Sequence, residues 1–280
     1  FSSGYPVFSS ISSPPGTYIL DIDAGAKYLW IGLDGQGVLY TEKNLLNPAW
    51  KAIQRIRGNP NSLNNHLVDV LKDDGNSTLW IGTRGSGLKR YFYLKPYGSP
   101  GSIHQYNFRE DDAHSLSDNS IIDIEIDRKN YLWVGTTNGL NRSRFPIQGD
   151  TLIDQFIRYG KGRITTISIN LDDNKYIGTD NGLYALENEE WLEIEGFQNE
   201  FINSIVWDIS HNMWVSTNSG IYVVTNNGMM RHFTSKDGLQ SNEFNARSAA
   251  IDTEGMIYFG GIKGMNIIDP QLLQKPIQPS

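Results

Sequence analysis

The sequence LWVGTTNG, from Leu132 to Gly139, decides the fold of this chain. A short apolar run ends in an aromatic, an aliphatic and a small residue, and a second glycine a few residues later opens another apolar run. Five further copies read LWIGLDGQG from Leu29, LWIGTRGSG from Leu79, KYIGTDNG from Lys175, MWVSTNSG from Met213 and IYFGGIKG from Ile257. A strand-type motif that recurs at a period of roughly forty residues is typical of a propeller. We therefore expect an all-β β-propeller.

Each repeat is interpreted as one four-stranded antiparallel blade. In the third copy, an inner strand IIDIEID from Ile121 leads through a turn to LWVGT, then GLNRS, and then FIRY. Strands packed between neighbouring blades are covered on both faces, which explains why their apolar residues are consecutive. The aromatic residues of the motif are expected to be equivalent inter-blade residues: Trp30, Trp80, Trp133, Tyr176, Trp214 and Tyr258.

The repeats predict one propeller domain over residues 1–270, with six blades, or seven if part of a longer ring is absent. Residues 1–10, which contain YPVFSS from Tyr5, are expected to add the outer strand of the last blade and so remove an exposed edge. Residues 271–280 read as a polar C-terminal linker. The chain is expected to be a domain excised from a larger protein.

Composition favours a soluble, ordered domain without nucleic-acid partners. The 280 residues include 28 Gly and 39% hydrophobic residues, enough for a sizeable core. The net charge of −7 and the pI near 5.2 leave no basic cluster for phosphates. The absence of cysteine excludes disulfides, thiolate catalysis and thiolate zinc sites. No apolar run approaches the roughly 20 residues of a membrane helix.

The repeat resembles the two-component regulator propeller repeat. The shared features are the inner strand, the Asp, Asn or Gly turn, the LWIGT strand and the following Gly-Leu. NPNSLNNHLVDV from Asn59 and DDAHSLSDNSIIDI from Asp111 match the family's approach to an inner strand, and the stretch 233–270 resembles its last repeat. The fourth copy departs from the pattern at Lys175 and Tyr176, and the fifth at Ser216.

The resemblance implies the extracytoplasmic, periplasmic sensor region of a bacterial inner-membrane receptor. In such receptors an immunoglobulin-like domain usually follows, then a membrane helix and a cytoplasmic histidine kinase or diguanylate cyclase. Some relatives respond to oligosaccharides, so a carbohydrate is the leading ligand by analogy. The domain would not be an enzyme, and no cofactor is implied.

Candidate ligand-binding residues follow from propeller geometry. The loops from each outer strand to the next inner strand, and from second to third strand, share one face around the axis. Amides, cations and a flat ring there would suit a small polar ligand. The candidates are Arg84, Arg163, Lys263, His66, Asn138, Asn181, Asn218, Asn242, Asn245 and Trp207. The alternative for each Asn is a plain turn role, since Asn is favoured in tight hairpins.

Two other functions remain open from the residues. A protein-interaction or homodimer scaffold would use exposed aromatics such as Tyr91, Phe92 and Tyr97. A lyase or hydrolase could use only the pair His66 and Arg84. The histidines have no HxH or HExxH spacing, so no metal site is expected.

Overall fold

A computed structural model describes residues 18–43, 49–54, 62–63, 67–94 and 101–271, and the described part is almost entirely β-strand. Helical conformation there is limited to one 3₁₀ turn, Ser235–Asp237, and to residues 270–271. The strands are, in chain order, β1 (Ile19–Ala24), β2 (Tyr28–Leu33), β3 (Gly37–Glu42), β4 (Lys51–Ile53), β5 (Val68–Asp73), β6 (Thr78–Thr83), β7 (Leu88–Phe92), β8 (Ile103–Tyr106), β9 (Ile121–Ile126), β10 (Leu132–Thr136), β11 (Gly139–Ser143), β12 (Phe156–Tyr159), β13 (Ile164–Ile169), β14 (Lys175–Thr179), β15 (Gly182–Glu187), β16 (Glu190–Glu193), β17 (Ile202–Trp207), β18 (Met213–Thr217), β19 (Ile221–Val224), β20 (Met230–Phe233), β21 (Phe244–Ile251), β22 (Ile257–Gly261) and β23 (Gly264–Ile268).

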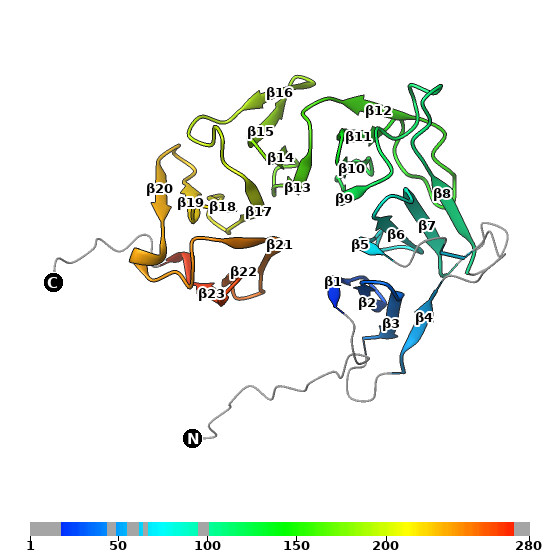
Figure 1. Cartoon of the computed structure of the whole chain (residues 1–280), viewed down its shortest axis with the longest axis horizontal. Coiled ribbons are helices and arrows are strands. Elements are labelled where there is room, and N and C mark those ends of the chain that lie inside the picture. The colour runs from blue at the N-terminus through cyan, green and yellow to red at the C-terminus, as the bar shows by residue number, and fades with distance from the viewer. Residues whose placement is uncertain (1–17, 44–48, 55–61, 64–66, 95–100, 272–280) are drawn as a thin grey trace.

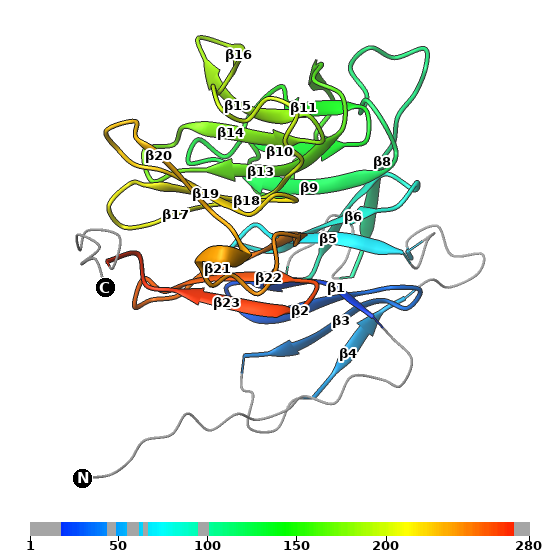
Figure 2. The ribbon, with the colours of Figure 1, turned by 60° about the vertical axis from the view of Figure 1, so that its left-hand side comes forward.

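These strands form six antiparallel sheets arranged around an axis, as the sequence predicts (Figure 1). Five blades have four strands, and the sixth, β21-β22-β23, has three among the described residues. The first strand of each blade lies innermost. In Figure 2, β5 lies between β9 and β1, so successive inner strands pack side by side. The six-bladed propeller is confirmed.

Apolar clusters between neighbouring blades hold the ring together. The seam between blades two and three, for example, joins Trp80 and Leu88 of one blade to Ile121 and Ile124 of the next. The glycine of the motif makes this packing possible, because a Cβ added at Gly82 would lie 2.7 Å from Cγ2 of Ile121. The repeat motif is thus a packing motif, with the large aromatic and the missing side chain on the same face.

The six motif aromatics do not all behave alike. Trp30, Trp80, Trp133 and Trp214 are fully buried between blades, as predicted. Tyr176 is half-buried and joins the seam between blades four and five. Tyr258 is the exception: no described blade covers its face, and its hydroxyl donates to Asp252 at 2.8 Å.

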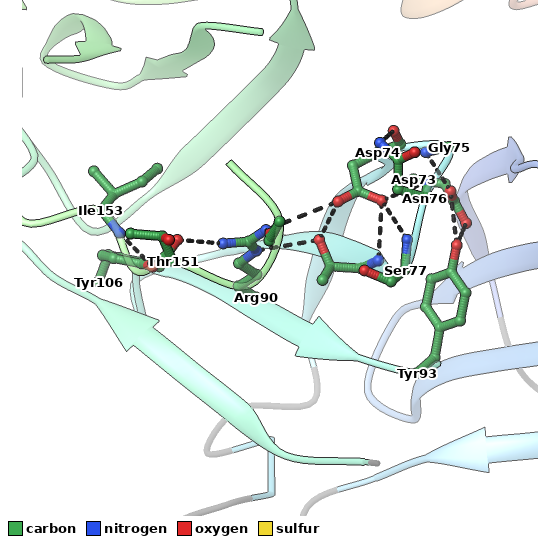
Figure 3. Close-up of polar contacts among 12 residues, drawn as sticks. Asp73, Asp74, Gly75, Asn76, Ser77, Arg90, Tyr93, Tyr106, Thr151 and Ile153 are labelled. Atoms are coloured by element: carbon green, nitrogen blue, oxygen red, sulfur yellow. Dashed lines mark hydrogen bonds and ion pairs between the residues drawn. The ribbon is translucent and has the colours of Figure 1, made fainter. Parts of the chain in front are cut away.

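A buried arginine ties a long loop to blade two (Figure 3). Arg90 on β7 is fully buried, and its guanidinium lies 4.9 Å from the centre of the Trp80 ring. It donates to the carbonyl oxygens of Thr151, at 2.7 Å, and Gly149. The loop between β11 and β12 of blade three is therefore anchored by a charge from blade two.

Some expectations are corrected or lie outside the described residues. Phe92 is not an exposed contact residue, because β7 extends to it and its side chain is fully buried; Tyr91 is half-buried against Trp30. The predicted closing strand within residues 1–10, and Tyr97, lie outside the described residues, as does nearly all of the predicted linker 271–280.

Candidate functional site

A cavity of about 240 Å³ lies where the inner strands converge on the axis. It is lined by residues of β1, β5, β9, β13, β17 and β21, so all six blades contribute. Its aliphatic side chains belong to the packing of the inner strands. Its charged residues are four carboxylic acids and two cations: Asp21, Asp23, Asp123, Glu125, Lys72 and Arg247.

Three of the carboxylates connect neighbouring inner strands. Asp21 and Asp23 of blade one accept hydrogen bonds from the backbone N–H groups of Leu71, at 2.6 Å, and Asp73, at 2.7 Å, in blade two. Asp123 of blade three accepts one from Ile167 in blade four, at 2.6 Å. A buried carboxylate is tolerated when it accepts such bonds. These residues therefore have a structural role as well as facing the cavity.

The two cations of the cavity are held differently. Lys72 forms an ion pair with Glu125, with Nζ 2.6 Å from Oε2. Arg247 donates from Nη2 to the backbone oxygen of Asp69 at 2.7 Å. Its Nη1 is buried and makes no hydrogen bond within the described residues. A buried guanidinium donor without a partner is unusual in a folded protein.

Arg247 reaches the axis because β21 is irregular. Phe244 pairs with Gly261 and Ala249 with Phe259, so residues 245–248 lie opposite the single residue Gly260. Arg247 has a φ of 55°, a left-handed conformation that is uncommon for a residue other than glycine. Bulges of this kind redirect side chains and occur often beside functional sites. The bulge therefore positions Arg247 toward the cavity.

A second arginine lies close by at the loop face. Arg84, in the turn between β6 and β7, contacts the carboxylate of Asp69 through Nε at 3.1 Å and Nη2 at 2.7 Å. This hydrogen bond raises the pKa of Arg84, which remains charged and largely exposed. Asp69 thus contacts Arg84 through its side chain and Arg247 through its backbone, which places both guanidinium groups at one end of the axis.

Burial gives the cavity acids unusual proton affinities. It raises the pKa of Asp123 to about 7, although Arg247 opposes the rise. It likewise raises the pKa of Asp23 to about 6 and that of Asp21 above its ordinary value. For Lys72, burial lowers the pKa, but the attraction of Glu125, Asp23 and Asp123 together outweighs burial, and the net pKa is raised. The cavity therefore holds two acids, Asp23 and Asp123, that take up protons near neutral pH.

These shifts predict a pH-dependent stability. Because an aspartate in the unfolded chain titrates near pH 4, the folded protein binds the proton of Asp123 more tightly. The stabilisation from that proton is complete below about pH 4 and is lost as the pH rises through about 7. Asp123→Asn should lack this loss, so the Tm advantage of the wild type over the variant should shrink between pH 4 and 7. Calorimetry of both proteins across that pH range measures the difference in Tm. A Tm difference that stays constant with pH would contradict the prediction.

Several predicted site residues lie in turns at the loop face, where their hydrogen bonds are those of turns. The backbone N–H groups of Asn138 and Asn181 each donate to a preceding threonine, Thr136 or Thr179, at 3.1 Å. The amide oxygen of Asn218 accepts from Asn203 at 2.9 Å. These contacts fit the turn role that the sequence also allowed, and ligand binding by the three side chains stays a prediction.

The remaining predicted residues are more scattered. Arg163, Lys263 and Asn245 are exposed, and the side chain of Asn242 accepts a bond from the backbone of Ser235 at 2.7 Å. His66 lies outside the described residues. Trp207 is at the far end of β17, about 17 Å along the strand from the loop face. There its indole N–H donates to the hydroxyl of Ser168, and the centre of its ring lies 4.7 Å from the centre of the Tyr176 ring.

Sequence reasoning missed the charged residues of the inner strands. Asp21, Lys72, Asp123, Glu125 and Arg247 are charges inside otherwise apolar strands, and that pattern was the available signal. A charge in a buried strand requires a polar surrounding, and on the inner strands of a propeller the axis supplies it. Two larger hollows lie away from the axis: one of about 390 Å³ beside the outer strands β8 and β12, and one of about 690 Å³ between the β5–β6 turn of blade two and the β11–β12 loop of blade three. Within the described ranges, no three His, Asp or Glu residues are grouped to hold a metal ion.

The fold defines the class of this protein as a propeller built from repeats, and comparison with known proteins supports that class. Residues 115–138, which include β9 and β10, match the family described as Two component regulator propeller. The resemblance found in the sequence is thus confirmed. The chain is 26% identical over 228 residues to histidine kinase P4 of Formosa agariphila, and the match covers 75% of this chain and 16% of that kinase.

Solved structures show the same architecture. The extracellular domain of BT3049 from B. thetaiotaomicron, assigned to a hybrid two component system, superposes with a TM-score of 0.68 at 22% identity. That match covers 88% of this chain and 32% of the other. An ancestral GH74 enzyme matches with a TM-score of 0.65 at 15% identity, over 90% of this chain and 37% of the other. At these identities the likeness to both structures shows the fold alone.

The chain spans about one sixth of the kinase that it matches and about one third of the extracellular domain. No described residues form a helix long and apolar enough to cross a membrane.

Proposed function

We propose that this propeller is the extracytoplasmic sensor domain of a bacterial membrane receptor, and that it binds a small polar ligand in the axial cavity. The repeat at residues 115–138, the histidine kinase relative and the extracellular propeller of similar fold support the receptor assignment. The observation that carries the ligand site is Arg247, whose buried Nη1 lacks a hydrogen-bond partner among the described residues. A ligand oxygen would supply that partner.

The lining of the cavity favours a neutral, polyhydroxylated ligand. A hydroxyl group both donates and accepts hydrogen bonds, so it can serve carboxylates and cations at once. An anionic ligand would face four acidic side chains of the cavity and only two cationic ones, which disfavours an anion. The volume of about 240 Å³ lies just below the range of roughly 300–1,000 Å³ for drug-sized ligands. A single sugar unit, or the end of an oligosaccharide, therefore suits the site.

Signal transfer would follow from the position of the cavity. A ligand that bridges Arg247 of blade six, Asp21 of blade one and Asp123 of blade three would tie distant blades together. Such a ligand shifts an existing equilibrium between states of the ring in proportion to its preference for one of them. The output would come from an immunoglobulin-like domain and a histidine kinase or diguanylate cyclase elsewhere in the receptor.

The site is proposed as a binding site and not as a catalytic one. The pair suggested for catalysis stays untested, because His66 lies outside the described residues; its partner Arg84 is engaged by Asp69. Most of the buried acids already accept backbone hydrogen bonds that hold the strands together. Binding, positioning and signal transfer are sufficient roles for such groups.

A thermal-shift screen tests the proposal. The 280-residue chain is heated with neutral sugars, uronic acids, amino acids and nucleotides, alongside Arg247→Gln and the exposed rim variant Arg144→Gln. A sugar at one hundred times its Kd should stabilise the protein by about 2.7 kcal/mol. We expect this shift in the wild type and in Arg144→Gln, and its loss in Arg247→Gln. An equal shift in all three proteins would place the ligand elsewhere.

A further inference from the structure

The axial cavity contains a regular tier of side chains near the start of the inner strands. In blades one to five, one residue of the inner strand pairs with the small residue of that blade's motif, as Asp123 pairs with Gly135. These five equivalent residues all line the cavity: Asp21, Val70, Asp123, Thr166 and Ser204. In blade six the bulge over residues 245–248 lies opposite Gly260, and Arg247 is the bulge residue that lines the cavity. Each blade thus contributes one side chain to the tier.

The two acids of the tier are explained by the strands that they connect. Asp21 accepts a hydrogen bond from the backbone N–H of Leu71 in the next blade, and Asp123 accepts one from Ile167 in the next blade. The carboxylate at this position reaches across to the neighbouring inner strand. Its polar character therefore serves the fold as well as the cavity.

Ser204 makes no such connection. Its side chain is 3% exposed, and its buried Oγ has no hydrogen-bond partner among the described residues. The oxygen of a serine lies closer to the backbone than those of an aspartate, and the neighbouring strand β21 is bulged at this level. A buried hydroxyl without a partner costs free energy. The contacts of the fold therefore do not account for a hydroxyl at Ser204.

Arg247 brings a second unpartnered group to the same tier. Its Nη1 is buried and makes no hydrogen bond within the part of the chain that the structure describes. Burial raises the pKa of Asp21 and that of Asp123, and the charge of Arg247 opposes both rises, so the guanidinium lies near both acids. Two side chains of the tier, from the neighbouring blades five and six, thus have hydrogen bonds still to make.

We propose that Ser204 is a ligand contact of the axial cavity, and that together with Arg247 it selects a ligand with neighbouring hydroxyl groups. This inference rests on the proposed function, because it names the group that the same site recognises. A guanidinium only donates hydrogen bonds, whereas a serine hydroxyl both donates and accepts them. The paired hydroxyls of a sugar satisfy both residues and can still donate to Asp21 or Asp123. A carboxylate has no hydrogen to offer these acids.

Ser216 supplies an internal comparison. It pairs with Ser204 in the strand register and is 1% exposed, and its Oγ also lacks a hydrogen-bond partner among the described residues. Its side chain, unlike that of Ser204, does not line the cavity. The two serines thus share residue type, burial and lack of a partner, and they differ in their access to a ligand.

The first measurement is the stability of the ligand-free protein with alanine at each serine. Ser143 is a fully buried serine whose Oγ accepts a hydrogen bond from the N–H of Leu132 at 3.0 Å. Ser143→Ala should lower the Tm by at least about 2 °C, because a buried donor loses its partner. Ser204→Ala and Ser216→Ala should not lower the Tm, because neither hydroxyl is bonded. A loss at Ser204 as large as that at Ser143 would assign its hydroxyl to the fold and overturn the proposal.

The second measurement is calorimetric titration with D-glucose, D-galactose, D-mannose and D-xylose. For the sugar that binds the wild type most tightly, Ser204→Ala should raise the Kd at least about threefold, the effect of one neutral hydrogen bond. Ser216→Ala should raise it less than about 1.5-fold. The deoxy form of that sugar which lacks the contacted hydroxyl should bind the wild type and Ser204→Ala equally well, because the two changes remove the same contact.

The wild type distinguishes the two ways in which this test can fail. If it binds a sugar and a folded Ser204→Ala protein binds that sugar with the same Kd, the contact is overturned and the axial site stands. If the wild type binds none of the four sugars, the axial sugar site is overturned, and the contact with it.

Discussion

Replacing Gly178 by valine is expected to reduce the free energy of unfolding by about 3 kcal/mol. A Cβ at this position would lie 2.6 Å from Cγ2 of Ile202 in the next blade and 2.8 Å from Cγ2 of Thr166 in its own. The valine methyl groups would extend further into a seam that is already filled, so the two blades must separate or distort. Urea unfolding followed by tryptophan fluorescence measures the loss.

Gly260→Val is the matched control, because it changes the same motif position in blade six. The three atoms nearest to a Cβ at Gly260 lie 3.1–3.8 Å away and all belong to Ser248 of the same blade. The free energy of unfolding should fall by less than about 1 kcal/mol, since substitutions outside packed regions usually have small effects. Equal losses at the two glycines would show that the motif glycine is not required by inter-blade packing.

Arg90→Leu is expected to destabilise the protein by about 3 kcal/mol. The substitution leaves the carbonyl oxygens of Gly149 and Thr151 without their charged donor, and each hydrogen bond to a charged group contributes about 1.5–3 kcal/mol. Asp74, whose carboxylate lies 3.8 Å from Nη2 of Arg90, would stay in place without the arginine. It also accepts hydrogen bonds from the backbone N–H groups of Ser77 and Thr78 at 2.9 Å (Figure 3). The loop near Thr151 should become sensitive to limited proteolysis at the same time.

Arg144→Leu supplies the comparison for Arg90→Leu. Arg144 is exposed and donates to Gln155 at 2.8 Å on the surface, so its loss should change stability by less than about 0.5 kcal/mol. Unfolding curves of the two variants that coincide with the wild type would show that Arg90 does not anchor the loop.

The fold could be predicted because the seams repeat one packing solution. Each blade has an aromatic ring and a glycine or serine at fixed positions, as at Trp133 and Gly135, and this packing requirement appears in the sequence as a period. The order of the strands within each blade could be predicted from the same repeated pattern. The exposure of Met265 could not be predicted, because Gly260 and Met265 are small and apolar, like their buried counterparts in the other blades.

The candidate site was predicted only in part. Arg84 was identified as a charge that turn geometry does not require, and it lies beside the axis through Asp69. Arg247 was missed because its approach to the axis depends on the bulge in β21, which a strand pattern does not reveal. For Asn138 and Asn181 the sequence could not separate a ligand contact from a turn role, since the two roles favour the same residue at the same place, and their backbone N–H groups do make turn contacts.

Isothermal titration calorimetry of the best-stabilising sugar tests the central claim most directly, with the wild type, Arg247→Gln and Arg144→Gln compared at one pH. The account predicts saturable one-site binding to the wild type and to Arg144→Gln, weakened at least about tenfold in Arg247→Gln, which corresponds to about 1.4 kcal/mol. An unchanged Kd in a folded Arg247→Gln protein would contradict the axial cavity as the ligand site.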